Sequence, residues 1–241
     1  MNAGRQIPVR LVLGKFRTSP QLASYLSRRL HADSTQWIHM LRDSCRFDSL
    51  ILRPECHMAL YLPNTYELYW TIEPKAFQKR MQEEFKVFWN LRRIAQAERI
   101  GLNFFEVITL ASIVEEESQY KPERPVIAGV YLNRLRIGMP LQADPTLKFA
   151  ALDFTLRRIG KNQIAIPSPY NTYKVKGLPP GPICTPSVDA IDAVLLSQSH
   201  TFLYFCADPS RPGAHRFASS WFGHRQNALA YHRWLDRRGI H

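Results

Sequence analysis

The chain is poor in the residues that build metal and redox sites. Its 241 residues include four cysteines, at positions 45, 56, 184 and 206, and no two of them form a CxxC pair. The eight histidines show no HxxH, HxH or HExxH spacing. Zinc-binding and dithiol-redox classes therefore have no support. Four cysteines are also too few for a disulfide framework, and a chain of this length can bury a core without one.

Long apolar runs are missing as well. No run approaches the roughly 18 consecutive apolar residues that a membrane-spanning helix needs. Residues 1–10 contain no apolar core of the kind that a signal peptide has. We therefore expect the chain as written to be soluble, with no anchor and no targeting segment.

Acidic residues are outnumbered by basic ones. The chain has 32 Lys and Arg against 20 Asp and Glu, a net charge of +12, and its isoelectric point is near 9.8. The excess is spread along the chain, with 16 basic against 9 acidic residues in 1–100 and 16 against 11 in 101–241. This charge fits a nucleic-acid partner, an anionic surface or polymer, or a simple aid to solubility.

The pattern mixes helices with a few short strands, so we predict an α+β fold. The composition, 45% hydrophobic and 22% charged, is that of a globular protein. A strand at 7–13 and helices at 21–30 and 34–43 would form a small lobe. Residues 58–70 are predicted to be a loop with extended flanks. Further helices are predicted at 74–99, 104–118, 124–137, 186–196 and 219–236 and from 145, with a hairpin at 201–207 and 215–218.

The helix at 104–118 ends in three consecutive glutamates. At about 100° per residue, Glu115 continues the apolar line of this helix, whereas Glu116 continues a polar line with Thr109 and Ser112. We therefore expect Glu115 to be desolvated, which would raise its pKa toward the range of a general acid. The alternative is that the helix frays before residue 115 and that all three glutamates are solvated.

Several separated motifs carry a resemblance to one family. They are, in order, LPNTYE (62–67), ASIVEEES (111–118), ERPVIAGVYLNRLRIGMPLQADPTL (123–147), YNTYKVKGLPPGPI (170–183) and FLYFCAD (202–208). Over about residues 50–232 the chain resembles the YceG-like endolytic murein transglycosylases (the MltG family), and residues 7–45 are similar to the end of that family's LysM-like lobe. The resemblance implies a partial LysM-like lobe at 1–50, followed by a catalytic domain of helices and short hairpins at 51–241.

The resemblance implies a lyase that acts on peptidoglycan. Such enzymes cleave the β-1,4 bond between MurNAc and GlcNAc, leave 1,6-anhydroMurNAc ends, and terminate or trim strands during wall assembly. The implied single acid/base is Glu115, which would protonate the leaving oxygen and then take the proton of the sugar's C6 hydroxyl. An ordinary glycosidase needs a second carboxylate, but here the substrate supplies the nucleophile. No metal and no cofactor are implied.

The resemblance also implies substrate-binding positions around that glutamate. Each has a structural alternative, since Asn133 could equally brace its helix and Asp144 could cap the next one. Glu117 is expected to support rather than to catalyse, because it lies about 200° around the helix from Glu115. The implied positions are Glu117, Asn133, Gln142, Asp144, Thr146, Tyr170, Asn171 and Tyr173.

The resemblance further implies a setting at the extracytoplasmic face of the bacterial inner membrane. The partners would be glycan strands and proteins of wall-synthesis or division complexes. The membrane helix that usually precedes the family's lobe is absent from this sequence, so we expect membrane contact only through such a segment. The chain also departs from the family's pattern: Ala143 replaces a usual hydroxyl residue, and residues 219–228 follow the pattern only in part.

Three other functions stay open. A basic nucleic-acid-binding module would need aromatic residues between basic ones, and here they lie mostly in apolar runs. A glycan-binding protein of the same fold without catalysis is disfavoured by the presence of Glu115. A pyridoxal-phosphate lyase would need a lysine beside a phosphate-cradling glycine-rich loop, which is not evident. The redox state of Cys45 and Cys56 is also left open.

Overall fold

The computed structural model describes residues 7–43, 46–47, 50–51, 54–156 and 158–238, so Cys45 lies outside the described residues. Helices and small antiparallel sheets make up this part of the chain, which confirms the α+β prediction. Two compact units are present: Met1–Thr109 with Pro180–Val188, and Leu110–Pro179 with Asp189–His241. The boundary between them falls inside helix α5 (Phe104–Glu117), whereas the sequence pattern placed a boundary near residue 50.

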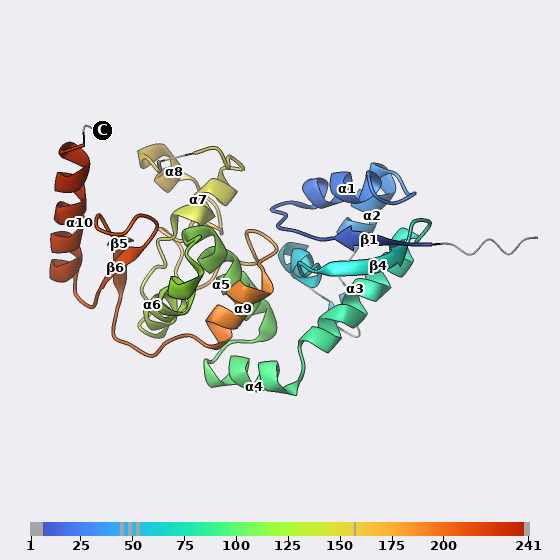
Figure 1. The fold of residues 1–241 in the computed structure, drawn as a ribbon, viewed down its shortest axis with the longest axis horizontal. Helices are drawn as coiled ribbons and strands as arrows, with labels where there is room; N and C mark the ends of the chain where they lie inside the picture. Colours follow the sequence, from blue (N-terminus) through green and yellow to red (C-terminus); the bar gives the residue numbers. More distant parts are fainter. Residues whose placement is uncertain (1–6, 44–45, 48–49, 52–53, 157, 239–241) are drawn as a thin grey trace, which may run out of the picture. The chain divides into compact units, whose positions relative to one another are not determined.

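A two-stranded sheet organises the first unit. Strands β1 (Pro8–Val12) and β4 (Thr65–Tyr69) pair antiparallel, with Pro8 opposite Tyr69 (Figure 1). Between them the chain forms α1 (Ser19–Ser27), α2 (Ser34–Asp43), β2 (Arg46–Phe47), β3 (Leu50–Ile51) and the 3₁₀ helix η1 (Pro54–Leu60). The loop predicted at 58–70 is therefore partly wrong, because Tyr66 and Leu68 alternate with exposed residues as a half-buried strand requires.

The core of the first unit gathers around Trp37 of α2. This side chain is fully buried, and its Nε1 donates a hydrogen bond to the carbonyl of Ala32 at 3.0 Å. Phe77 meets the indole edge-on, with ring centres 5.3 Å apart. Leu22 and Leu26 of α1 are buried as well. Aromatic and leucine side chains thus fix the lobe without any disulfide among the described cysteines.

The single helix predicted at 74–99 is wrong, because the structure has two helices there. They are α3 (Pro74–Phe88) and α4 (Leu91–Arg99). The Asn90 side chain accepts a hydrogen bond from the backbone N–H of Arg93 at 3.1 Å and so caps α4. An N-cap needs extended backbone, which the helical periodicity of the flanking residues does not reveal.

Helix α5 (Phe104–Glu117) begins with a capping box. Asn103 Oδ1 accepts from the N–H of Glu106 at 3.0 Å, and Glu106 Oε2 accepts from the N–H of Asn103 at 2.8 Å. Every residue from 107 to 114 is buried, including Thr109 and Ser112. The predicted polar line is therefore wrong: this helix is enclosed on all sides, so its surface pattern carries little information about its phase.

Helix α6 (Arg124–Arg136) follows the short 3₁₀ helix η2 (Lys121–Glu123), and Gly138, with a φ of +63°, lies just beyond its C-terminal end. Its middle lies against the segment that precedes β5. A Cβ on Gly129 would lie 2.5 Å from the carbonyl oxygen of Gln198 and 2.6 Å from Nε2 of His200. Only glycine permits this approach, and it brings residues about 70 positions apart into contact.

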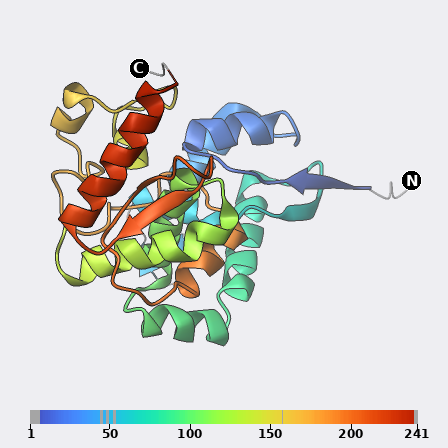
Figure 2. The same ribbon diagram turned by 60° about the vertical axis from the view of Figure 1, so that its left-hand side comes forward.

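The rest of the second unit consists of short elements. They are α7 (Asp144–Ala150), α8 (Lys161–Ala165), α9 (Val188–Leu195), the hairpin of β5 (Tyr204–Ala207) and β6 (His215–Ala218), and α10 (Trp221–Asp236). Helix α10 packs along this hairpin (Figure 2). Residues 168–186 contain no helix or strand, as their prolines predict. Among the described residues, no helix is both long and apolar enough to cross a bilayer.

Candidate active site

A cavity of about 280 Å³ opens in the second unit. Its walls come from the end of α5, from α6, from the segments near residues 142 and 173, from β5 and from the start of α10. Four residues predicted from the sequence meet here, namely Glu117, Gln142, Asp144 and Tyr173. The full lining consists of Glu117, Tyr131, Arg134, Leu141, Gln142, Asp144, Tyr173, Tyr204, Phe205, Trp221 and His224.

Glu117, the last residue of α5, carries a carboxyl group with an unusual pKa. Its Oε1 accepts a hydrogen bond from the hydroxyl of Tyr131 at 2.6 Å. Burial is the main cause that raises the pKa of Glu117 from 4.5 to about 7; the charge of Asp144 also raises it, whereas the Tyr131 hydrogen bond, Arg134 and Lys148 lower it. A carboxyl with this pKa can both give and take a proton near neutral pH.

Arg134 stands three residues after Tyr131 and therefore on the same face of α6. Its Nε donates to the carbonyl of Leu203 at 2.7 Å, and its Nη1 donates to the carbonyl of Leu141 at 2.6 Å. The guanidinium carbon lies 5.5 Å from the centre of the Tyr204 ring. We call Arg134 with these two carbonyls the Arg134 clamp. It joins two walls of the cavity and also places a cation near Glu117.

Asp144 brings a second carboxylate to the cavity, at the first residue of α7. Its Oδ1 accepts a hydrogen bond from the Tyr173 hydroxyl at 2.5 Å. Burial, and then this carboxylate, raise the pKa of Tyr173. Gln142 lies beside them with a φ of +51°, and its N–H donates to the carbonyl of Thr172 at 3.0 Å. A non-glycine residue in this region is uncommon and is held there by its surroundings.

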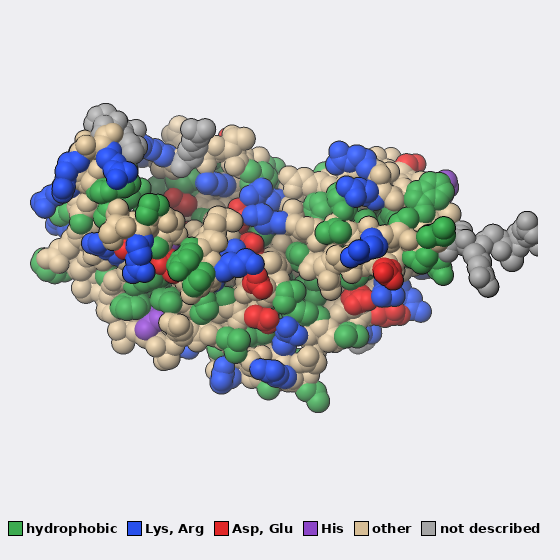
Figure 3. Space-filling view, viewed as in Figure 1, with side chains coloured by type: hydrophobic (Ala, Val, Ile, Leu, Met, Phe, Trp, Pro, Cys, Tyr) green, Lys and Arg blue, Asp and Glu red, His purple; other side chains and the backbone are tan. Residues whose placement is uncertain are grey.

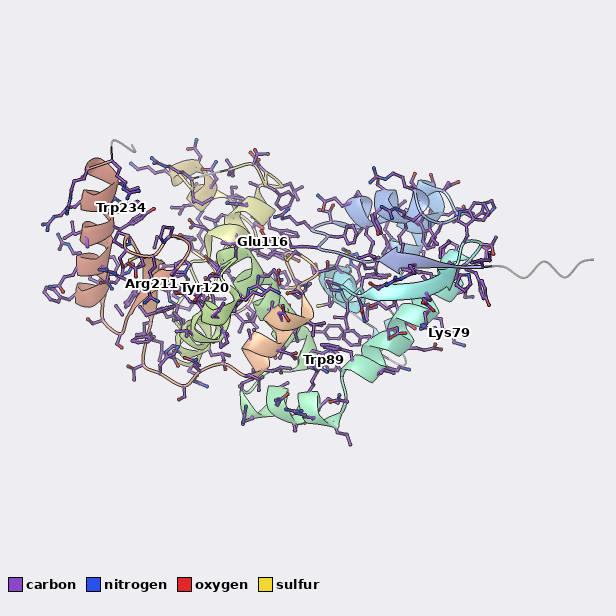
Figure 4. The ribbon with its side chains drawn as sticks, in the orientation of Figure 1. Lys79, Trp89, Glu116, Tyr120, Arg211 and Trp234 are labelled. Atoms are coloured by element: carbon purple, nitrogen blue, oxygen red, sulfur yellow. The ribbon has the colours of Figure 1, made fainter. Side chains whose placement is uncertain are left out.

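Glu115 lies elsewhere. Its Oε1 is 3.3 Å from Nη2 of Arg124, and the two side chains are only 13% and 3% exposed. Arg124 also donates to the carbonyl of Ser118 at 3.1 Å. Neither Glu115 nor the half-buried Glu116, which Figure 4 labels on α5, lines the cavity. The catalytic role of Glu115 stays a prediction, but of the three glutamates Glu117 is the one that lines the cavity, together with Tyr131 and Asp144.

Two residues predicted to bind substrate, on α6 and α7, make hydrogen bonds within the fold. Asn133 Nδ2 donates to the carbonyls of His200 at 2.8 Å and Phe202 at 3.0 Å. Thr146 is fully buried, and its hydroxyl donates to the carbonyl of Ala143 at 2.7 Å. Neither side chain lines the cavity, and their substrate-binding role stays a prediction.

The predicted residues of the proline-rich loop divide in the same way. Asn171 is fully buried and donates to the carbonyls of Ile164 at 3.0 Å and Ile166 at 2.8 Å. Tyr170 packs on Phe149, with ring centres 4.6 Å apart. These contacts hold the loop, and Tyr173 alone among its three predicted residues reaches the cavity.

Sequence reasoning missed seven lining residues. The signal for Tyr131 and Arg134 was their spacing on α6, which places both on the face that meets the end of α5. Tyr204 and Trp221 gave no signal, because they follow Glu117 by about 90 and 100 positions and reach the cavity only through tertiary packing. The seven are Tyr131, Arg134, Leu141, Tyr204, Phe205, Trp221 and His224.

Lys and Arg side chains are numerous on the face drawn in Figure 3, where Asp and Glu side chains also lie. Among the residues that the structure describes, no group of three or more His, Cys, Asp or Glu side chains is placed to hold a metal ion.

Comparison with known proteins settles the family. The sequence profile of the YceG-like family matches residues 1–230. The chain is a member of the YceG-like family. The solved structure of a YceG-like protein from Listeria monocytogenes is similar, with a TM-score of 0.73 and 25% identity, and the likeness covers 91% of this chain and 75% of that one.

Curated relatives of this YceG-like chain share one name. An endolytic murein transglycosylase of Bacillus subtilis strain 168 is 44% identical over 102 residues, which are 42% of this chain and 28% of that protein. An endolytic murein transglycosylase of Streptococcus pneumoniae strain R6 is 37% identical over 140 residues, 54% of this chain and 24% of that protein. The chain thus spans about a quarter of the length of the curated relatives it matches.

Proposed function

We propose that this YceG-like chain is a peptidoglycan lytic transglycosylase and that Glu117 is its acid/base. It would cleave the MurNAc–GlcNAc β-1,4 bond inside glycan strands and leave 1,6-anhydroMurNAc ends. The observation that carries the proposal is the Glu117 carboxyl, whose pKa is raised to about 7 in a cavity that also holds Tyr131 and Asp144. The name shared by the relatives supports the substrate class.

The proposed reaction needs one group that acts twice. Glu117 in its protonated form gives its proton to the glycosidic oxygen as the bond to C1 breaks. The resulting carboxylate then takes the proton of the C6 hydroxyl of the same muramyl residue, whose oxygen bonds to C1. The proton count is restored and no water is consumed. A pKa near the working pH suits both steps, since neither protonation state is then rare.

Tyr131 and Arg134 would support this cycle. The Tyr131 hydroxyl donates to Glu117 Oε1 at 2.6 Å, so it stabilises the carboxylate once the proton has left. The buried guanidinium of Arg134 favours the same charged state. The Asp144 carboxylate, already bound by Tyr173, adds negative charge that would stabilise an oxocarbenium-like transition state at C1.

Asp144 also supports a second candidate, a hydrolase. Two carboxylates in one cavity are the equipment of a glycosidase that uses water. The end group separates the two candidates. Purified glycan strands should yield 1,6-anhydro termini inside former strands, detected by mass spectrometry of the fragments. Reducing ends in their place would establish hydrolysis, and intact strands would leave only the glycan-binding role.

The setting follows from the substrate. We propose that the protein acts at the extracytoplasmic face of the cell membrane, where peptidoglycan is assembled, together with proteins of wall synthesis. The LysM-like character expected for residues 1–50 is also a proposal. The pairing of β1 with β4 (Thr65–Tyr69), with α1 and α2 between them in the chain, supports a lobe of that kind that extends past residue 50. Glutamine variants of Glu115, Glu116 and Glu117 distinguish which glutamate is the acid/base.

A further inference from the structure

Three aromatic rings stand together at one wall of the cavity, outside the set predicted from the sequence. Tyr204 comes from β5, and Trp221 and His224 come from the first turn of α10. The ring centres are 5.8 Å apart for Tyr204 and Trp221, 5.4 Å for Trp221 and His224, and 5.3 Å for Tyr204 and His224. We call these three residues the aromatic platform. The acid/base proposed above does not use it.

Contacts with neighbouring elements hold the aromatic platform in place. Ser220 caps α10, since its hydroxyl accepts from the N–H of Gly223 at 3.2 Å. Tyr204 pairs with Ala218 across the hairpin and lies over the Arg134 clamp. Burial, and then the nearby Arg134 charge, lower the pKa of His224 and so disfavour its charged form. Tyr204 and His224 are thus held in place, and the Trp221 ring packs against them.

Trp221 is the exposed member. Its side chain is 62% exposed although it lines the cavity. A large aromatic residue at a cavity edge, tilted against the rings of Tyr204 and His224, offers an apolar indole face to a ligand in the cavity. Its indole N–H lies at the edge of that ring, and the Tyr204 hydroxyl and the His224 imidazole add polar groups to the same cavity lining.

The ligand chemistry follows from this combination. A pyranose ring has an apolar C–H face and a rim of hydroxyl and amide groups, which matches a flat aromatic face with polar atoms at its edge. A nucleotide fits less well, because Glu117 and Asp144 in the same cavity would repel its phosphates. A protein partner would need a wider apolar patch than the exposed rings of Trp221 and Phe222 provide.

We propose that the aromatic platform is a sugar-binding subsite, in which Trp221 stacks on one N-acetylated pyranose of the glycan strand beside Glu117. This inference rests on the proposed function for the identity of the strand. Trp221 and His224 lie in the segment 219–228, where the chain departs from the family's pattern. The subsite would therefore be a substrate contact particular to this member.

The test uses a matched pair of neighbouring aromatic residues. Trp221 and Phe222 are 62% and 72% exposed, but only Trp221 lines the cavity. Chitohexaose serves as the probe, because it supplies N-acetylated pyranoses without a muramyl group, and calorimetry gives its Kd. Trp221→Ala should weaken binding about 5- to 30-fold, the loss of one stacked aromatic contact, while Trp221→Phe keeps most of the affinity and Phe222→Ala changes it less than about twofold.

Each outcome bears on the platform. An unchanged Kd for Trp221→Ala, an equal loss for Phe222→Ala, or no binding of chitohexaose by the unmodified chain would overturn the inference. Melting temperatures of the variants identify any loss of affinity that is caused by unfolding. If Trp221→Ala unfolds, the Kd of Trp221→Phe tests the inference. Glycan digestion separates this inference from the proposed function. Trp221-dependent binding without anhydro ends would support the sugar-binding subsite and contradict the lytic transglycosylase activity. Anhydro ends with a KM unchanged in Trp221→Ala would support the activity and contradict the subsite.

Discussion

Replacing Glu117 by glutamine removes the transferable proton and the carboxylate charge. The amide keeps the size of the side chain, and its oxygen can still accept the Tyr131 hydrogen bond. General acid–base catalysis contributes about 10²–10⁴-fold. Because Glu117 acts in both half-steps, Glu117→Gln should lower kcat by about 10⁴-fold or more, with a small change in KM. The assay counts 1,6-anhydro ends released from glycan strands per minute.

The same substitution should stabilise the fold at alkaline pH. The difference between a pKa of about 7 in the folded chain and 4.5 in the unfolded chain corresponds to roughly 3 kcal/mol. Since the folded pKa is the higher one, the cost is absent below pH 4.5, grows up to pH 7 and is complete above it. Glu117→Gln avoids this cost, so its melting temperature should exceed that of the unmodified chain by several degrees at pH 8 and match it at pH 4.

Glu115→Gln and Glu116→Gln are the matched controls. Glu115→Gln leaves the buried Arg124 without its carboxylate, which should cost about 1.5–3 kcal/mol of unfolding free energy while the folded enzyme keeps its kcat. Glu116→Gln, at a residue outside the cavity lining, should keep the kcat of the unmodified chain. The reasoning is refuted if Glu117→Gln retains normal activity. Loss of activity in Glu115→Gln alone, with an unchanged melting temperature, would restore Glu115 as the acid/base.

Two further predictions concern the pH profile and the packing of α6. The alkaline limb of kcat/KM should fall near pH 7, where the proton of Glu117 is lost. Because the Tyr131 hydrogen bond lowers the pKa of Glu117, Tyr131→Phe should move that limb to higher pH. A limb that does not move would show that another group titrates. Gly129→Ala should lower stability by about 1–3 kcal/mol in a denaturant titration, since its Cβ would lie 2.5 Å from the carbonyl oxygen of Gln198. Gly14→Ala, whose Cβ meets nothing within 4 Å, is the control.

The sequence predicted elements better than it predicted which side chains face each other. The helix at 34–43 and the start of α5 at Asn103 were found because caps and turn residues act locally. The break at Asn90 was missed, since a cap inside an otherwise helical pattern competes with continuation and the balance is set by packing. Strand β4 was missed because its partner, β1, lies more than 50 residues earlier.

The glutamates show why the site was harder to predict than the fold. A helical phase can be deduced only when one face is solvated, but α5 is buried on all sides from residue 107 to residue 114. The apolar line that leads to Glu115 therefore did not show which glutamate faces the cavity. That choice depends on Arg124 for Glu115 and on Tyr131 for Glu117, and both partners belong to the next helix.

The hydrogen-bond acceptors in the Arg134 clamp make the connection between two walls of the cavity independent of pH. Leu141 and Leu203 receive the guanidinium through backbone carbonyls, which neither gain nor lose a proton in any ordinary buffer. Had carboxylates held Arg134, the two walls would loosen at the pH where those carboxylates neutralise. The Arg134 clamp therefore does not change with pH, so Glu117 can alternate between its two protonation states in a cavity of constant shape.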